Sequence, residues 1–284
     1  MSTQIRTVTV LGAGVLGSQI AYQSAFKGFA VTVYDIDDDA LAVARRRFDT
    51  LVATYTAEVP GGEEGAATAL ERLALTTDLS QAAAEADLII EAIPEVLDLK
   101  RQTYGKLAAL APAKTIFATN SSTLLPSDLK DSTGRPDRFL ALHFANRIWA
   151  SNIAEVMGTA ETDPKVFREV VAFAEAIGMV PIEIHKEKAG YVLNTLLVPF
   201  LRAALELVAG GYAEPGDVDN TWRIGTGAPV GPFQIYDVIG LRTPYNIMVH
   251  GDEEAQQLAT WLKTNYIDKG KLGLESGQGF YKYM

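Results

Sequence analysis

A histidine and a glutamate, each in or beside an apolar segment, could together move a proton. His143 follows the apolar run 139–142, and Glu155 lies inside a second apolar segment, 152–157. A neutral imidazole can accept the proton of an alcohol, and a carboxylate beside it orients the ring and stabilises the imidazolium form. The polar segment 120–123, Asn-Ser-Ser-Thr, also follows an apolar run, so it is expected at the same end of a sheet.

A glycine-rich motif near the N-terminus could bind phosphates. Residues 12–17 read Gly-Ala-Gly-Val-Leu-Gly, between a β-branched run at 5–11 and helical spacing at 15–27. In this context G-x-G-x-x-G is typical of a dinucleotide site, because its glycines permit a tight turn, close approach of a pyrophosphate and close helix packing. The free N–H groups of the helix N-terminus then face the phosphates. We expect the cofactor to contact Gly12, Gly14, Val15, Leu16 and Gly17.

Asp35 is expected to select the cofactor. It ends the next predicted strand, 30–34, where a carboxylate can accept hydrogen bonds from an adenosine ribose. Three further aspartates follow at 37–39, with no Arg or Lys beside them, so a 2′-phosphate would be repelled. The sequence therefore predicts NAD rather than NADP, and the following aspartates are expected mainly to cap a helix.

Alternating strands and helices must position these residues. Short apolar or β-branched runs lie at 5–11, 30–34, 73–77, 87–90, 115–118, 139–143, 152–157 and 180–184. Helical spacing separates several of them, at 15–27, 38–56 and 99–110. The segment 58–65 reads as a turn, and another helix is expected between it and 73–77. This alternation predicts an α/β protein with a Rossmann-type, doubly wound, mostly parallel sheet.

The pattern changes after Lys186, where the spacing becomes helical and the breaks are Gly and Pro clusters such as 225–232. We predict two domains, an NAD-binding Rossmann-type domain at 1–187 and an all-helical C-terminal domain at 188–284.

Composition excludes several classes of function. The 284 residues include no cysteine, so there is no disulfide framework, thiolate metal site or Cys nucleophile, and no metal site is expected. The net charge of −10 disfavours nucleic acid and anionic membranes as partners. The long apolar stretch 191–212 is interrupted by Asn194, Arg202 and Glu206, which indicates an amphipathic helix rather than a membrane span. We expect a cytoplasmic protein that binds small molecules.

The chain resembles the L-3-hydroxyacyl-CoA dehydrogenase family, which includes bacterial 3-hydroxybutyryl-CoA dehydrogenases. Motifs along the whole chain carry the resemblance, and their order and spacing are specific. They are GAGVLG at 12–17, EAIPE at 91–95, TNSSTL at 119–124, HFAN at 143–146, AEVMG at 154–158, AGYVLNTLL at 189–197, GPFQIYDVIG at 231–240 and GKLGLESGQGFYKY at 270–283.

The resemblance implies an enzyme that uses NAD to interconvert a short-chain L-3-hydroxyacyl-CoA and its 3-oxoacyl-CoA. His143 would be the catalytic acid/base and Glu155 its partner, while Ser122 and Asn194 would hydrogen-bond the reacting oxygen of the substrate. Further contacts with NAD are implied for Glu95, Lys100 and Asn146. The resemblance also implies a homodimer formed through the C-terminal domain, which would also bind the substrate.

Departures from the family pattern leave two alternatives open. Arg147 stands where proline usually follows the motif asparagine, and it could hold a substrate carboxylate, contact CoA or form a surface ion pair. The helical arm that usually helps to bind CoA in the family is short here; its one basic cluster is 45–47, and acidic residues follow at 58–64. In addition, Thr195 and Glu275 stand at positions that are often basic in the family. The alternatives are a relative that oxidises a free hydroxy acid or other small secondary alcohol, and a non-catalytic dinucleotide-binding protein.

Overall fold

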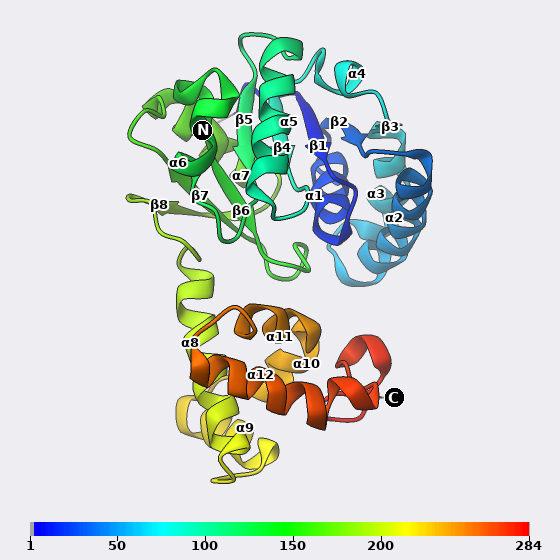
Figure 1. The fold of residues 1–284 in the computed structure, drawn as a ribbon. Coiled ribbons are helices and arrows are strands. Elements are labelled where there is room, and N and C mark those ends of the chain that lie inside the picture. Colours follow the sequence, from blue (N-terminus) through cyan, green and yellow to red (C-terminus); the bar gives the residue numbers. More distant parts are fainter. Residues whose placement is uncertain (1–2, 284) are drawn as a thin grey trace. The chain divides into compact units, whose positions relative to one another are not determined.

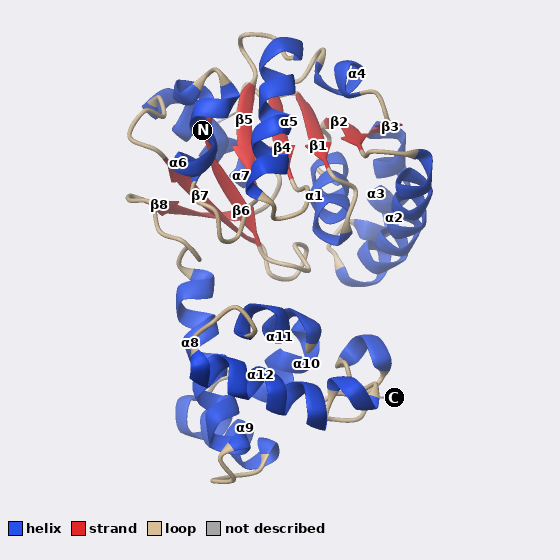
Figure 2. Cartoon of the chain, in the orientation of Figure 1, coloured by secondary structure: helices blue, strands red, loops and turns tan. Residues whose placement is uncertain are grey.

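The computed structural model describes residues 3–283, which fall into two compact units divided between Val192 and Leu193 (Figure 1). The sheet lies in the first unit, and the second consists of helices and their connections (Figure 2). The predicted boundary between the NAD-binding domain and the C-terminal domain, between residues 187 and 188, stays a prediction. Among the described residues, no helix has the length and apolar character needed to cross a membrane.

An eight-stranded sheet forms the centre of the first unit, in the order β3-β2-β1-β4-β5-β6-β7-β8. The strands are β1 (Thr7–Leu11), β2 (Ala30–Tyr34), β3 (Leu73–Thr76), β4 (Leu88–Glu91), β5 (Ile116–Thr119), β6 (Phe139–Phe144), β7 (Ile153–Gly158) and β8 (Val180–Ile184). The β6–β7 pair is antiparallel and the other neighbours are parallel. The predicted Rossmann-type, mostly parallel sheet is confirmed. Its strand order reverses between β1 and β4, where ligands bind in such folds.

Helices bury both faces of this sheet. They are α1 (Val15–Phe26), α2 (Asp38–Glu58), α3 (Gly62–Ala69), α4 (Leu79–Ala83), α5 (Leu97–Leu110), α6 (Pro126–Leu129) and α7 (Pro164–Ala176). Along β4, Leu88 and Ile90 belong to the core that includes residues of α1, α2, α3 and α7. Ile89 belongs to the core that includes residues of α4, α5 and α6. Successive residues of one strand therefore face opposite helical layers, which explains the continuous apolar runs.

The turn expected at 58–65 is wrong in its second half. Helix α2 ends at Glu58, and α3 already begins at Gly62. Glu63 and Glu64, which looked like turn residues, occupy the first turn of α3, where negative charge favours the helix N-terminus. A polar, glycine-rich stretch that looks like a turn therefore contains the start of a helix.

The second unit has its own apolar core. Its helices are α8 (Leu193–Ala209), α9 (Pro215–Thr226), α10 (Pro232–Ile239), α11 (Arg242–Met248) and α12 (Glu253–Asn265), which confirms the predicted helical C-terminal part. Two buried aspartates tie this unit together. Asp219 accepts hydrogen bonds from the first N–H groups of α10, at Phe233 and Gln234, and Asp237 accepts from the backbone of Phe280 and Tyr281 in the C-terminal segment.

Candidate active site

Four loops of the first unit meet at one edge of the sheet. Strands β1, β4, β5 and β6 run parallel, so the segments that follow them all lie at their carboxyl ends. These segments contain the glycine-rich loop at 12–17, the acidic segment at 92–95, the serine pair at 121–122 and the loop after His143. The topology thus brings together residues that lie more than a hundred positions apart in the chain.

His143 and Glu155 are paired across the antiparallel strands β6 and β7. The imidazole Nδ1 lies 2.9 Å from Oε2 of Glu155, and the side chains are 4% and 1% exposed. A carboxylate can only accept, so the Nδ1–H donates to Glu155 and Nε2 is left as the basic nitrogen. Nε2 lies 3.0 Å from the hydroxyl of Ser122, which is only partly buried. This chain of carboxylate, imidazole and hydroxyl can accept and return a proton.

Each glycine of the loop after β1 has a structural reason. Gly12 has φ 92°, and a Cβ there would lie 2.6 Å from the carbonyl oxygen of Ala92; at Gly17 it would lie 1.9 Å from the oxygen of Gly12. Around Gly14, by contrast, no heavy atom of the described residues would lie within 4 Å of a Cβ, beyond its chain neighbours. Gly14 is also the N-cap of α1 and has no side chain to occupy the free N–H groups. The loop therefore offers an open, anion-binding backbone that fits a pyrophosphate.

Asp35 follows β2 and contacts this loop. Its Oδ2 accepts a hydrogen bond from the N–H of Ala13 at 2.7 Å, and its Oδ1 accepts from the N–H of Ile36. Asp37 caps α2 by accepting from the N–H of Ala40, the role expected for these aspartates. Helix α2 brings the guanidinium of Arg47 to the carbonyl oxygen of Ala13, at 3.1 Å, so a cation contacts the loop that Asp35 also contacts.

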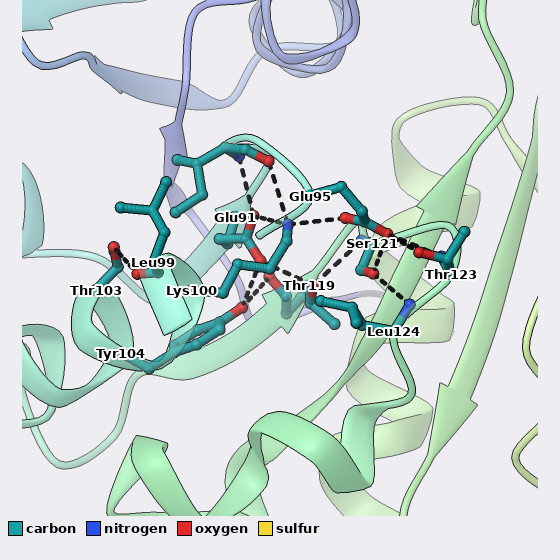
Figure 3. A network of polar contacts seen from close by, with 12 residues as sticks. Glu91, Glu95, Leu99, Lys100, Thr103, Tyr104, Thr119, Ser121, Thr123 and Leu124 are labelled. Atoms are coloured by element: carbon teal, nitrogen blue, oxygen red, sulfur yellow. Dashed lines mark hydrogen bonds and ion pairs between the residues drawn. The ribbon is translucent and has the colours of Figure 1, made fainter. Parts of the chain in front are cut away.

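A buried ion-pair network lies between α5 and the ends of β4 and β5 (Figure 3). The side chain of Lys100 is 1% exposed, and its Nζ lies 2.5 Å from Glu91 and 3.2 Å from Glu95. Glu95 in turn accepts hydrogen bonds from the hydroxyl of Ser121 and from the N–H and hydroxyl of Thr123. Burial alone would raise the pKa of Glu95, but these hydrogen bonds and the charge of Lys100 outweigh it and lower the pKa to about 2. Glu95 therefore stays a carboxylate that fixes the serine loop.

The loop after β6 is held by α1. The side-chain oxygen of Gln19, a buried residue, accepts hydrogen bonds from the N–H groups of Arg147 and Ile148. Asn146 is exposed on this loop. Arg147 has φ 59°, and its guanidinium lies 3.6 Å from Glu58 and over the ring of Trp149. The surface ion pair is thus present, whereas contact of Arg147 with a substrate carboxylate or with CoA stays a prediction.

Several predicted site residues remain without a test. Asn194 is the second residue of α8 and belongs to the second unit, so its part in the site stays a prediction. The ammonium group of Lys100 lies between Glu91 and Glu95. Direct contact of Lys100 with NAD therefore also stays a prediction.

Sequence reasoning missed Glu91, Gln19 and Tyr191. A charged residue that ends the apolar strand β4 was a usable signal for Glu91. Gln19 and Tyr191 carried no such signal, because their contacts depend on tertiary packing.

Comparison with known proteins gives one consistent family. The model described as "3-hydroxyacyl-CoA dehydrogenase, NAD binding domain" matches residues 7–188, and "3-hydroxyacyl-CoA dehydrogenase, C-terminal domain" matches 190–283. The mouse mitochondrial hydroxyacyl-coenzyme A dehydrogenase is 33% identical over 98% of this chain and 91% of its own. A probable 3-hydroxybutyryl-CoA dehydrogenase of Bacillus subtilis is 31% identical over 99% and 98%.

Similarity to solved structures extends over the whole chain. A diketoreductase structure, described for the dual catalysis of dicarbonyl compounds, is 63% identical, with a TM-score of 0.95 and 100% of both chains covered.

Proposed function

Because the chain belongs to the 3-hydroxyacyl-CoA dehydrogenase family of NAD-dependent oxidoreductases, we propose that it interconverts a short-chain L-3-hydroxyacyl-CoA and the matching 3-oxoacyl-CoA. The observation that carries the proposal is the hydrogen-bonded chain of Ser122, His143 and Glu155 at the ligand-binding edge of the sheet. The family membership also sets aside the non-catalytic alternative.

The proposed acid/base chemistry follows from the two nitrogens of one imidazole. In the oxidation direction, Nε2 of His143 accepts the hydroxyl proton of the substrate, and the carboxylate of Glu155 stabilises the imidazolium that forms. Ser122 donates a hydrogen bond to the substrate oxygen as charge develops on it, and Asn194 is proposed as a second donor. In reduction the imidazolium returns the proton to the new alcohol.

The cofactor site fits NAD. Bound NAD supplies the acceptor for the hydride that leaves the carbinol carbon. The open backbone at Gly14 and the free N–H groups of Val15 and Leu16 at the start of α1 would hold the pyrophosphate, and Asp35 the ribose. Glu95, Lys100 and Asn146 are proposed to contact or support the rest of the cofactor.

A second candidate is the oxidoreduction of a small alcohol or ketone without CoA. The 63% identical structure is that of a diketoreductase, described as catalysing reactions of dicarbonyl compounds. This similarity favours substrates of that class. The acidic end of α2 also favours it, since Glu58 would repel the phosphates of CoA.

A substrate comparison tests both candidates. We expect NADH formation with 3-hydroxybutyryl-CoA to exceed that with free 3-hydroxybutyrate, and NADH oxidation with acetoacetyl-CoA to exceed that with pentane-2,4-dione. Turnover of the dione or the free acid, with none of either thioester, would establish the second candidate instead. The same assays on His143→Ala supply the baseline without the acid/base group.

Arg147 adds a test of the free-acid form of this candidate. If Arg147 leaves Glu58 to bind a substrate carboxylate, Arg147→Ala should raise KM for 3-hydroxybutyrate about ten- to a hundredfold, as expected for a charge-assisted hydrogen bond. Because the structure has Arg147 in an exposed ion pair, which contributes little, we expect KM for the thioester to change less than about twofold.

We also propose that the two parts of the chain have different functions. Residues 1–187 would bind NAD, and 188–284 would contribute to substrate binding and form a homodimer. A cytoplasmic location stays a prediction.

A further inference from the structure

One aromatic residue lies against the middle of the Ser122–His143–Glu155 chain. The ring of Tyr191 is stacked on the imidazole of His143, with centroids 4.4 Å apart and an interplanar angle of 9°. Its hydroxyl donates to the carbonyl oxygen of Ser121 at 2.7 Å. The next residue, Val192, donates its N–H to Oε1 of Glu155 at 2.9 Å. The short segment after β8 therefore contacts all three groups or their immediate neighbours.

The backbone of Tyr191 is in a conformation that tyrosine rarely adopts. Its φ is 52°, and among the described residues only Arg147 shares a positive φ without being glycine. The N–H of Tyr191 donates to the carbonyl oxygen of Lys188, which closes a tight turn through Gly190. Glycine would adopt this turn without strain. A tyrosine here indicates that the ring and hydroxyl make contacts that outweigh the strain.

The hydroxyl of Tyr191 has a fixed task. Burial raises the pKa of Tyr191, and the charges of Glu95, Glu155 and Glu91 raise it further, so the phenol keeps its proton and can only donate to Ser121. The side chain of Ser121 is held from the other side by Glu95, at 2.6 Å. Together these bonds fix the backbone immediately before Ser122.

We propose that Tyr191 is a positioning residue for the acid/base dyad. Its ring sets the plane of the His143 imidazole, and its hydroxyl sets the backbone that carries the Ser122 hydroxyl. The inference rests on the proposed role of His143. Since the dyad must be held within a fraction of an ångström of its working geometry, the loss of the ring should slow turnover rather than weaken cofactor binding.

The ring also acts on the charged form of His143. The face of an aromatic ring attracts a cation, so stacking stabilises imidazolium more than neutral imidazole. Glu155 from β7 and Ser122 from the segment after β5 also face the imidazole. Both remain when Tyr191 is replaced, so comparing a variant without the ring and hydroxyl with one that lacks only the hydroxyl isolates the effect of the ring.

Two variants separate the ring from the hydroxyl. Tyr191→Leu removes both, and Tyr191→Phe removes only the hydroxyl. For Leu we expect kcat to fall about 10- to 100-fold, with KM and the Kd for NADH within about twofold of wild type. The limb of the kcat profile that reports the acid/base group should move to lower pH, because the stacked ring no longer favours the cationic form. For Phe we expect the wild-type pH profile and a smaller loss of kcat.

Nuclear magnetic resonance of the unmodified protein gives a test that needs no variant. A stacked ring shifts the carbon-bound imidazole protons of His143 upfield, and we expect this shift in the wild type and in Tyr191→Phe. If these protons of the wild type have the chemical shifts of an unstacked histidine, the inference is overturned, even if Tyr191→Leu fails to fold. So would a Tyr191→Leu enzyme with wild-type kcat and pH profile, or one whose loss of kcat is matched by loss of NADH binding. A His143→Ala enzyme with wild-type turnover would instead refute the proposed function itself.

Discussion

The imidazole of His143 has a defined role at each nitrogen because its neighbours differ. Glu155 can only accept, so it fixes the proton on Nδ1, whereas Ser122 can both donate and accept and leaves Nε2 free to change its protonation state. The two ring partners come from different elements, Glu155 from within β7 and Ser122 from the segment after β5. The pairing of β6 with β7 sets the contact with Glu155. The geometry of a proton-transfer site is thus set by backbone register.

We expect Glu155→Gln to lower kcat strongly, within the roughly 10²–10⁴-fold range of general acid/base groups, while NADH still binds. The amide oxygen can still accept from Nδ1–H, but it no longer offsets the charge of the imidazolium. Steady-state kinetics and NADH titration by fluorescence check this. Glu183→Gln, an exposed residue on the neighbouring strand β8, is the matched control and should leave kcat unchanged. Wild-type turnover in Glu155→Gln would contradict the dyad.

Asp35 is expected to set the preference for NADH over NADPH. A carboxylate that binds the ribose would repel a 2′-phosphate, and charged hydrogen bonds of this kind correspond to about a ten- to hundredfold change in affinity. We expect Asp35→Asn to weaken NADH binding by about that factor and to improve NADPH binding, because Arg47 of α2 contacts the same loop and remains. Titration of both cofactors against both proteins measures the ratio. An unchanged ratio would show that Asp35 only supports the loop.

The elements were predictable where a local pattern decides the structure. The β-branched runs gave the strands, and the glycine motif gave the turn into α1, because both patterns act within a few residues. The start of α3 at Gly62 was not predictable, since a polar glycine-rich stretch fits a turn equally well.

Contacts that cross the fold were also beyond local reasoning. The approach of Arg47 to Ala13 and the stacking of Tyr191 on His143 depend on how distant elements pack. The dyad could still be proposed because both of its residues lie in or beside predicted strands and an acid next to a histidine is a recognisable acid/base pair. The antiparallel register of β6 and β7 that joins them was not readable from the sequence.

The C-terminal segment should depend on α10 through a single carboxylate. Asp237 is fully buried and accepts from two backbone N–H groups and the hydroxyl of Tyr283. Asp237→Ala leaves these donors without an acceptor, so we expect the free energy of unfolding to fall by about 3 kcal/mol. Urea denaturation measures it. Asp49→Ala, at an exposed position within α2, should change stability by less than about 0.5 kcal/mol, and equal effects of the two variants would contradict this role of Asp237.

The molecule as a whole carries its exposed apolar residues unevenly. In the second unit, Leu196 is 67%, Tyr212 81% and Ile224 83% exposed, although this unit already has a buried core of its own. Large apolar side chains on the surface indicate an interaction site when they gather there. Homodimers with closed symmetry are the commonest oligomers, and a self-complementary apolar face is what such a dimer buries.

We therefore expect the protein to be a homodimer that associates through the second unit. Light scattering at micromolar concentration should give twice the 30.6 kDa of one chain. Ile224→Glu should shift the mass toward the monomer, because a carboxylate buried in an apolar interface without a partner is costly. Thr50→Glu, an exposed position on α2 of the first unit, should leave the dimer intact. A monomeric wild type would refute the dimer, and a dimer that survives Ile224→Glu would place its interface away from α9.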